Sequence, residues 1–389
     1  MGNNSAEGKL DFGAKRRAGG KDSKPVRASP QSRATARDVA TFAGVSASAV
    51  SRTFTKGASV SPTTRHKVID AARLLGYRPN LLARSLTTKR TELIGLISNN
   101  FENPLFLEIF DHFTRRLQQH GLRPLLANLT DGEPPDGALN MLLQYSVDGV
   151  IVASSSLHRK LLKACAEARL PAVQAFGRPA GRTRANVVAA DNVQGGRVAA
   201  DLFCERGYSR VAFLGGPVDA TSTEDRLKGF RKRLSEQDVA LVAEVYGDAF
   251  SYAAGRTLMR CLIERGGIDG VFCGDDILAI GAIDTCREFG ISVPGEIGIV
   301  GFDDMPMASW RAYNLTTIRQ PVADIIGTAI ELIISIVEEP DRPSGSQLFA
   351  CDAVVRDTLR PASAAKNRTS APSDAIAVRL GRLRSNMDR

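Results

Sequence analysis

The feature that most constrains the fold is a regular alternation, between residues 92 and 303, of short apolar runs with longer amphipathic segments. Runs such as LIGLIS at 93–98 are apolar on both faces, which is typical of strands in parallel sheets. The segments between them have the length and periodicity of helices. The alternation therefore predicts parallel sheets covered by helices on both faces. The expected strands are 93–98, 124–129, 148–154, 171–176, 210–216, 269–275 and 297–303, and the expected helices 104–120, 157–168, 192–206, 223–237, 251–265 and 277–289.

The strand pattern by itself leaves two architectures open for residues 92–360. A single closed barrel and a pair of doubly wound lobes both alternate strands with helices, and both bind ligands at the carboxyl ends of their strands. Composition does not distinguish them.

Residues 34–76 have a different pattern, which predicts three short helices. Thr35 is placed to cap the first, and Ser46 to cap the second. Ser61 precedes a proline, which is favoured at the first position of a helix, and Gly76 is placed to end the third helix.

The charge is divided unevenly along the chain. Residues 34–91 carry 10 basic and 2 acidic side chains, whereas 92–360 carry 27 basic and 35 acidic ones. A short basic segment beside an acidic body is typical of a head that binds polyanions, although a merely solvated basic face is the alternative. The flanking segments 1–33 and 361–389 are basic and poor in large apolar side chains, so we expect them to be disordered arms.

Several classes of protein are disfavoured by what the sequence lacks. No apolar stretch approaches the ~20 residues of a transmembrane helix, and the N-terminus has no apolar segment of a secretory signal, so we expect a cytoplasmic protein without a membrane partner. The six cysteines are scattered, and the four histidines show no metal-ligand spacing. We therefore expect neither a cofactor nor an enzymatic activity.

Ordered motifs give the chain a resemblance to a known family. Residues 35–56 read TARDVATFAGVSASAVSRTFTK, and 60–97 contain VSPTTR, LGYRPN, ARSL and IGLI. Weaker matches follow, among them NPLF at 103–106, RLKGF at 226–230 and IGIVGFDD at 297–304. The chain thus resembles the lactose-repressor (LacI) family of bacterial transcriptional regulators.

The resemblance implies a fold and a division into domains. It implies an all-α helix-turn-helix head joined to an α/β two-lobed periplasmic-binding-protein-like domain with parallel sheets, and so disfavours the barrel. The expected boundaries are 34–78 for the DNA-binding domain, 79–91 for a hinge helix and linker, and 92–360 for an effector-binding and dimerisation domain.

By this resemblance the second helix of the head would enter the major groove. Arg52 is best suited to read bases because a guanidinium can bridge guanine O6 and N7, with a plain phosphate contact as the alternative. Ala47 offers only a methyl group and Ser48 a short hydroxyl, so we expect modest base readout. Where the family commonly carries asparagine, this chain has Thr55 and Lys56. The residues of the head expected to contact DNA are Thr35, Ser46, Ala47, Ser48, Ser51, Arg52, Lys56 and Tyr77.

The segment NLLARSL at 80–86 resembles the family's hinge helix, which forms when two subunits dock on operator DNA. Asn80 and Arg84 would contact DNA there. Leu86 aligns with the leucine that wedges between base pairs from the minor groove, and an ordinary apolar residue of an amphipathic linker is the alternative. A helix this short is only marginally stable by itself, and its formation would therefore depend on the partner hinge and on DNA.

The resemblance also implies that an effector lies between the two lobes. Arg226 and Asp303 would combine a rigid donor fork with an acceptor, which suits vicinal hydroxyls or a carboxylate. The family often carries asparagine where this chain has Asp275, and the added negative charge favours polyhydroxyl or cationic ligands, although Arg226 offsets it. The expected effector-binding residues, each with an ordinary structural role as the alternative, are Phe106, Ser154, Arg226, Phe250, Asp275 and Asp303.

These inferences predict a homodimeric regulator that binds a roughly palindromic double-stranded operator. Of repression and activation, repression is the action we expect. A small molecule, a sugar or polyol, would control its affinity for DNA. A solute-binding protein for sugar uptake is the alternative, because residues 92–360 alone fit that class. The basic head and the missing secretory signal argue against it, and a sugar-modifying enzyme would need a catalytic constellation that the sequence lacks.

Overall fold

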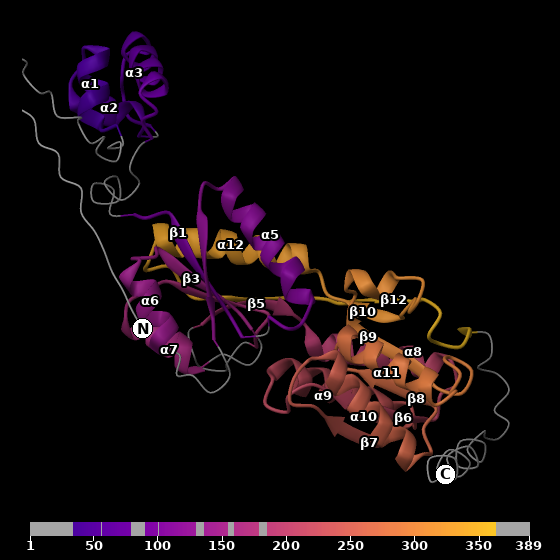
Figure 1. The fold of residues 1–389 in the computed structure, drawn as a ribbon. Helices are drawn as coiled ribbons and strands as arrows, with labels where there is room; N and C mark the ends of the chain where they lie inside the picture. Colours follow the sequence, from indigo (N-terminus) through magenta and orange to yellow (C-terminus); the bar gives the residue numbers. More distant parts are fainter. Residues whose placement is uncertain are drawn as a thin grey trace, which may run out of the picture. The chain divides into compact units, whose positions relative to one another are not determined.

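The computed structural model describes residues 34–55, 57–78, 90–99, 101–129, 136–154, 159–178 and 185–362. The chain divides into two compact units, one ending at Arg84 and the other beginning at Ser85, and each has its own apolar core. Figure 1 labels their helices and strands. No helix within the described ranges has the length and apolar character needed to cross a bilayer. The expected arms lie outside the described residues, apart from Pro361 and Ala362.

The first unit, called the head, contains the three predicted helices α1 (Ala36–Ala43), α2 (Ala47–Thr53) and α3 (Pro62–Leu74). The Thr35 hydroxyl accepts from the amide of Asp38, whose carboxylate accepts from the Thr35 amide, so the capping box predicted by the sequence is present. Ser46 and Ser61 cap α2 and α3 in the same way. Unpaired amides at each helix start are thus satisfied by side chains that the sequence places there.

Small apolar side chains from all three helices form the core of the head. Phe54 and Tyr77 extend this core, and their ring centroids lie 5.9 Å apart. Burial of the Tyr77 ring raises the pKa of its hydroxyl. The buried residues of this core are Val39, Ala40, Val50, Val68, Ala71 and Ala72.

The second unit contains two six-stranded sheets, which define a first and a second lobe. In the first lobe the strand order is β11-β5-β4-β3-β1-β2, and all pairs are parallel. The strands are β1 (Leu93–Ser98), β2 (Arg123–Asn128), β3 (Gly149–Ala153), β4 (Ala172–Ala175), β5 (Asn186–Ala190) and β11 (Ser346–Phe349). The helices are α5 (Leu105–Gln119), α6 (Asp136–Gln144), α7 (Arg159–Glu167) and α12 (Val322–Glu338).

Successive side chains of these strands point to opposite faces, as a doubly covered sheet requires. On β3, Ile151 belongs to the core that α5 and α12 share, whereas Val150 and Val152 belong to the core under α6 and α7. Phe113 of α5 and Leu161 of α7 are representative partners on the two sides. Helices thus cover both faces of the sheet, as the sequence predicts (Figure 1).

The second lobe repeats this plan with the strand order β12-β10-β9-β8-β6-β7. Its helices pack in pairs, α8 with α9 and α10 with α11. The expectation of parallel sheets needs one correction, because β12 runs antiparallel to β10. The strands are β6 (Arg210–Gly215), β7 (Ala240–Tyr246), β8 (Gly270–Cys273), β9 (Gly298–Asp303), β10 (Thr317–Arg319) and β12 (Asp352–Val354). The helices are α8 (Asn192–Glu205), α9 (Thr221–Glu236), α10 (Tyr252–Arg265), α11 (Asp276–Glu288) and the 3-10 turn η1 (Pro306–Ser309).

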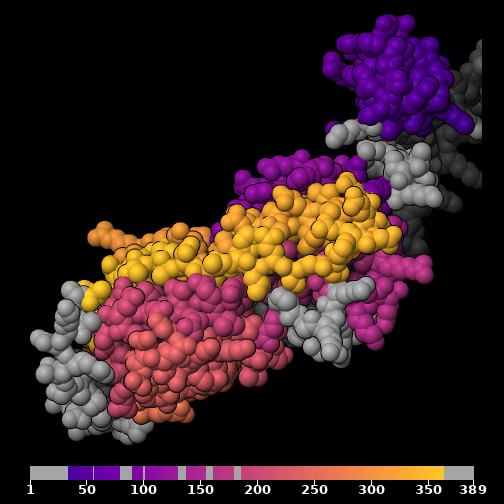
Figure 2. Space-filling model, turned by 180° about the vertical axis from the view of Figure 1, so that it is seen from behind, coloured from indigo at the N-terminus to yellow at the C-terminus, as the bar shows by residue number. Residues whose placement is uncertain are grey.

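Within the described residues, the chain passes between the lobes three times. The crossings lie between β5 and α8, between β10 and α12, and between β11 and β12. Figure 2 shows the C-terminal part of the described chain, in yellow, running along both lobes. Neither lobe is therefore a continuous stretch of sequence.

Two glycines let α8 and α9 touch backbone to backbone. A Cβ on Gly196 would lie 2.0 Å from the carbonyl oxygen of Arg226, and one on Gly229 would lie 1.9 Å from that of Val193. Any side chain would force the helices apart. This contact brings the second turn of α9, which carries Arg226, beside the start of α8, where Asn192 lies.

Candidate functional site

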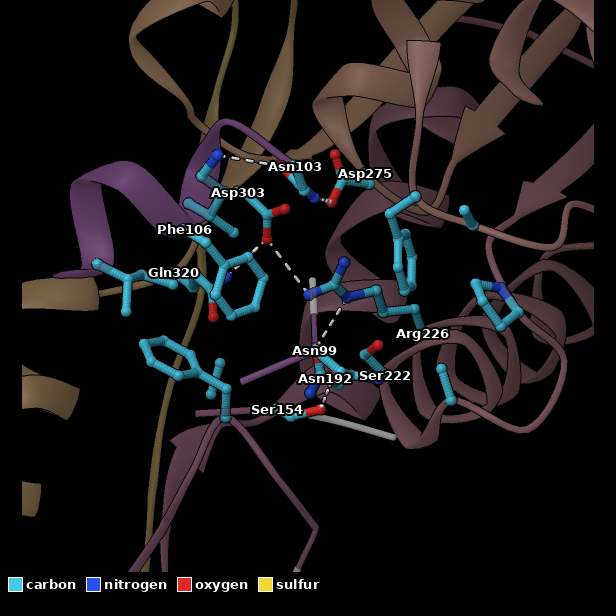
Figure 3. A pocket seen from close by; sticks show the side chains of 18 of the residues that line it. Asn99, Asn103, Phe106, Ser154, Asn192, Ser222, Arg226, Asp275, Asp303 and Gln320 are labelled. Atoms are coloured by element: carbon cyan, nitrogen blue, oxygen red, sulfur yellow. Dashed lines mark hydrogen bonds and ion pairs between the residues drawn. The ribbon is translucent and has the colours of Figure 1, made fainter. Parts of the chain in front are cut away.

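A cavity of the second unit lies between the lobes, at the carboxyl ends of their strands. Ligands bind at this edge in doubly wound sheets, and the volume, about 370 Å³, is of the size that holds small molecules. Figure 3 shows side chains converging on it from both lobes. The lining residues are Asn99, Asn103, Leu105, Phe106, Ile109, Ser154, Phe176, Ala190, Asn192, Pro217, Asp219, Ala220, Ser222, Arg226, Asp248, Ala249, Phe250, Asp275, Asp303 and Gln320.

All six residues that the sequence nominates for the effector line this one cavity. The first lobe supplies Phe106 from α5 and Ser154 from the end of β3. The others come from the second lobe, on α9 or at the ends of β7, β8 and β9. They are Arg226, Phe250, Asp275 and Asp303.

Arg226 is held on several sides in the floor of the cavity. Its Nε donates to Asn192 at 2.8 Å, one terminal nitrogen donates to the Gly274 carbonyl, and the other lies 3.3 Å from Oδ1 of Asp303. The guanidinium carbon lies 3.6 Å from the ring centroid of Phe302, so the cation stacks on an aromatic face. A buried arginine fixed in this way presents a preformed recognition group rather than a mobile one.

Asp275 and Asp303 form a buried pair of carboxyl groups beside Arg226, and each is 3% exposed. Burial raises the pKa of both; for Asp303 the Arg226 cation opposes this rise, and the negative charge of Asp275 adds to it. A hydrogen bond between the two carboxyls lowers the pKa of Asp275 and raises that of Asp303. The proton that the pair shares is therefore held on Asp303.

The backbone of Asp303 is in the left-handed region, with φ of 111°. A non-glycine residue in this region carries strain, and such strain is concentrated at functional sites. Its Oδ1 accepts from Arg226 and, at 2.6 Å, from Gln320 at the end of β10. These contacts hold the carboxyl group over the cavity despite the strained backbone (Figure 3).

Sequence reasoning missed the amide side chains that complete the site. Asn103 donates to Asp275 at 2.8 Å and so joins the two lobes through the cavity, while its Oδ1 accepts from the amide of Leu105. Asn192 and Gln320 orient the Arg226 and Asp303 side chains. A signal for two of them was available, because Asn103 lies in the NPLF motif and Gln320 in the segment LTTIRQP at 315–321, which also resembles the family.

Further lining residues were also missed, and several are polar. Ser154 donates to Asn99 at 2.8 Å on the side of the first lobe. Asp219 and Asp248 lie exposed at the mouth. Nothing in the sequence distinguishes these two carboxylates from ordinary surface residues, because their position depends on how the strand ends converge.

In the head, the outer face of α2 carries the residues expected to contact DNA. Ala47, Ser48, Ser51 and Arg52 are exposed, whereas Ala49, Val50 and Thr53 face the core. The Ser46 hydroxyl caps α2 through the amide of Ala49 and lies 2.9 Å from the Ser48 hydroxyl. The exposed face is thus free of core packing, as a helix that enters a groove requires.

Two other predicted contacts of the head have structural roles as well. Thr35 takes part in the capping box of α1, and Tyr77 packs partly buried against Phe54. The remaining predicted DNA contacts, Lys56, Asn80, Arg84 and Leu86, lie outside the described residues.

Comparison with known proteins identifies the family. The family model for bacterial regulatory proteins of the lacI family matches residues 35–80, and the model for the periplasmic binding protein-like domain matches 200–359. The ribose operon repressor of Halalkalibacterium halodurans is 32% identical over 335 residues, which cover 86% of this chain and 99% of that protein. The chain belongs to the LacI family.

Solved structures of LacI-family proteins share the fold. The Lac repressor dimer bound to operator and the anti-inducer ONPF aligns with a TM-score of 0.76 and 27% identity, over 85% of this chain and all of that one. A complex of the transcriptional regulator CelR with cellobiose aligns with a TM-score of 0.64 and 28% identity, over 84% of this chain and all of that one. The two-lobed architecture that the sequence favoured over a barrel is thus confirmed.

Membership of the LacI family makes this chain a DNA-binding transcriptional regulator, as the sequence predicts. Its relatives are named as regulators and repressors, not as enzymes or transport proteins. The alternative of a solute-binding protein for sugar uptake is accordingly excluded by the match of the head to the lacI family model.

Proposed function

We propose that this LacI-family regulator is a homodimeric repressor whose affinity for operator DNA is set by a sugar or polyol bound between its lobes. One observation carries the effector part of the proposal. Arg226, Asp303 and the other four residues nominated from the sequence line a single cavity, together with Asn103, Asn192 and Gln320. Donors and acceptors at fixed positions beside apolar rings are suited to a polyhydroxyl ligand.

The names of similar proteins support this class of effector. The CelR structure is described as a complex with cellobiose, and the relative from Halalkalibacterium halodurans is named for the ribose operon. Both names point to sugars.

For the DNA side, we assign residues 34–78 to the DNA-binding domain, 79–91 to a hinge and 92–360 to effector binding and dimerisation. The exposed face of α2, including Ser48 and Arg52, reads the major groove, while Leu86 of the hinge enters the minor groove. We place the protein in the cytoplasm. There a dimer bound to a palindromic operator positions two such heads on neighbouring half-sites.

Effector and operator are coupled through the geometry of the lobes. A ligand changes the population of two states only by the difference in its affinity for them. Asn103, which binds Asp275 across the cavity, changes partners if the lobes move. The ligand thereby controls the separation of the paired hinges.

Binding of the purified full chain to promoter DNA beside its own gene tests the proposal. Fluorescence anisotropy should show sequence-dependent binding that weakens steeply with salt, because phosphate contacts release counterions. Adding the correct sugar should shift the affinity. Failure of every candidate operator would contradict the DNA part, and an affinity indifferent to all sugars that bind would contradict the coupling.

Leu86→Ala tests the hinge in the same assay. Specific binding should weaken far more than binding to unrelated DNA, since the wedge acts only where the operator bends. Equal losses on both DNAs would count against the wedge.

A further inference from the structure

The cavity is strongly unbalanced in charge. Among the described residues that line it, Arg226 is the one cationic side chain, whereas Asp219, Asp248, Asp275 and Asp303 all carry carboxyl groups. A site built for an acidic ligand would have the opposite balance, because a carboxylate or phosphate needs more than one positive partner when removed from water.

The single cation is already committed. Arg226 is 5% exposed, donates to Asn192, Gly274 and Asp303, and stacks on Phe302. An anionic ligand would have to displace Asp303 from it, which would leave a buried carboxyl group without its cationic neighbour. Breaking a buried ion pair destabilises a protein by more free energy than an exposed ion pair with the ligand contributes.

One atom in the cavity wall is left open for a ligand. Oδ2 of Asp303 is buried and accepts no hydrogen bond from the described residues, while Oδ1 already accepts from Arg226 and Gln320. The proton that Asp303 shares with Asp275 therefore lies on Oδ2, and this oxygen keeps a lone pair that can accept from a ligand. Both oxygens of the adjacent Asp275 accept, one from Asn103 and one from the amide of Ile277. The unmet requirement at this end of the cavity is therefore for a donor, which hydroxyl and ammonium groups supply and anionic groups lack.

The mouth of the cavity is also negatively charged. Asp219 follows β6 and Asp248 follows β7, both are exposed, and neither pairs with another described side chain. Two uncompensated carboxylates at an entrance repel anions over roughly a Debye length, ~8–10 Å at physiological salt. The negative charge at the mouth and the open acceptor in the interior thus both favour ligands without negative charge.

The geometry points to an effector without negative charge: a neutral sugar, or an amino sugar whose hydroxyl or ammonium group donates to Asp303, with uronates and sugar phosphates excluded. This inference rests on the proposed sugar-binding function and narrows it. A hydroxyl group and an ammonium group can both donate to Oδ2 of Asp303, so the experiment must distinguish neutral sugars from amino sugars.

Thermal shift of the full chain against matched sets of sugars tests the inference. Each set contains a neutral sugar, its 2-amino form, its uronate and its phosphate, starting with glucose and galactose and extending to pentoses and disaccharides. We expect every sugar that raises the Tm to be neutral or amino, with affinity at least tenfold above its uronate and phosphate. A uronate or phosphate that binds as tightly as its neutral counterpart would overturn the inference. No shift in any set would instead contradict the proposed sugar-binding function.

A double variant, Asp219→Asn with Asp248→Asn, isolates the charge at the mouth. The preference for the neutral sugar over its uronate should fall by a factor on the order of ten, since each charge acts at several ångströms in a solvated setting. Asp238→Asn is the control, because this exposed aspartate of the same lobe lies in a left-handed turn, outside the cavity, that asparagine tolerates. An unchanged preference in the double variant, or an equal change in the control, would contradict the role of the mouth.

Discussion

Arg178 of the first lobe donates two hydrogen bonds to Asp225 of the second, both 2.7 Å long. The same guanidinium lies 3.0 Å from Glu224, and all three contacts join the segment after β4 to the first turn of α9. The first two turns of α9 also carry Ser222 and Arg226, which line the cavity. The start of α9 thus both lines the effector cavity and ties the lobes together.

Removing this ion pair should loosen the closed arrangement of the lobes. Arg178 is 33% exposed and Asp225 15%, so for Arg178→Ala we expect a loss of about 1 kcal/mol in the free energy of unfolding after allowance for solvent screening. We also expect a larger radius of gyration in small-angle scattering and weaker effector binding.

Arg231→Ala is the matched control for Arg178→Ala. Arg231 forms a similarly forked pair with Glu244, but both residues belong to the second lobe. The control should leave the radius of gyration and effector affinity unchanged. An unchanged Arg178→Ala protein, or the same change in both variants, would refute the interlobe role.

Gly196→Ala should separate α8 from α9. The new methyl group would meet the Arg226 carbonyl at 2.0 Å, so we expect a loss of about 1–3 kcal/mol from overpacking, together with weaker effector binding as Arg226 moves. Urea denaturation and a titration with the effector measure the two effects.

Gly137→Ala provides the comparison for that substitution. It lies in α6, and a Cβ there would have nothing within 4 Å, so the change should stabilise the protein by about 0.5–1 kcal/mol. If both variants gained stability, the contact between α8 and α9 would not be as tight as described.

Asp303→Asn should stabilise the ligand-free protein while weakening effector binding. The amide can accept from Arg226 and Gln320 through its oxygen and donate to Asp275 through its nitrogen, which removes the buried acid pair. Because the pKa of Asp303 is raised in the folded state, the native protein binds this proton more tightly than the unfolded chain. The wild type therefore loses stability as the pH rises through that pKa, and the gain from asparagine should grow with pH.

Denaturation in urea between about pH 5 and pH 8 checks the sign of this effect. Asp304→Asn is the control, because Asp304 accepts from Arg319 and Arg356, both at 2.6 Å, and should lose stability on substitution. A variant at 303 that is less stable than the wild type throughout this range would contradict the proton-sharing pair.

Arg52→Ala should reduce sequence discrimination by the head. A bidentate contact with guanine contributes about 1–3 kcal/mol to discrimination, so specific binding should weaken by roughly one to two orders of magnitude while nonspecific binding changes little. Ser51→Ala, on the same exposed face, should weaken both modes slightly. Uniform weakening by Arg52→Ala would identify a phosphate contact instead.

The predicted strands and helices were largely confirmed where apolar runs are long. The runs at 93–98 and 297–303 match β1 and β9 to within a residue. The strands β5, β7, β10, β11 and β12 were missed. β7, β11 and β12 are partly exposed edge strands, and β5 and β10 are interior strands of only five and three residues, so the pairing of all five is set by distant partners. The helices α6 and α12 were missed as well, although the buried isoleucines of α12 recur at helical spacing.

The cavity was predictable in part. Arg226, Asp275 and Asp303 were found through motifs, whereas Asp219, Asp248 and the pair of Arg178 with Asp225 were not. These residues come from segments far apart in the sequence, and no local pattern records how two sheets face each other. Charge counting along the chain identified the head but not the acidic mouth.

The three crossings between the lobes have a consequence for how proteins of this kind can be recombined. Exchanging one lobe with a relative requires several gene segments to be replaced together, because each sheet draws strands from widely separated positions. The head is one continuous stretch that ends by Arg84, so a single junction suffices to graft it onto another sensor. New operator preferences are thus obtained by one splice, whereas new ligand preferences must arise by point substitution around the cavity.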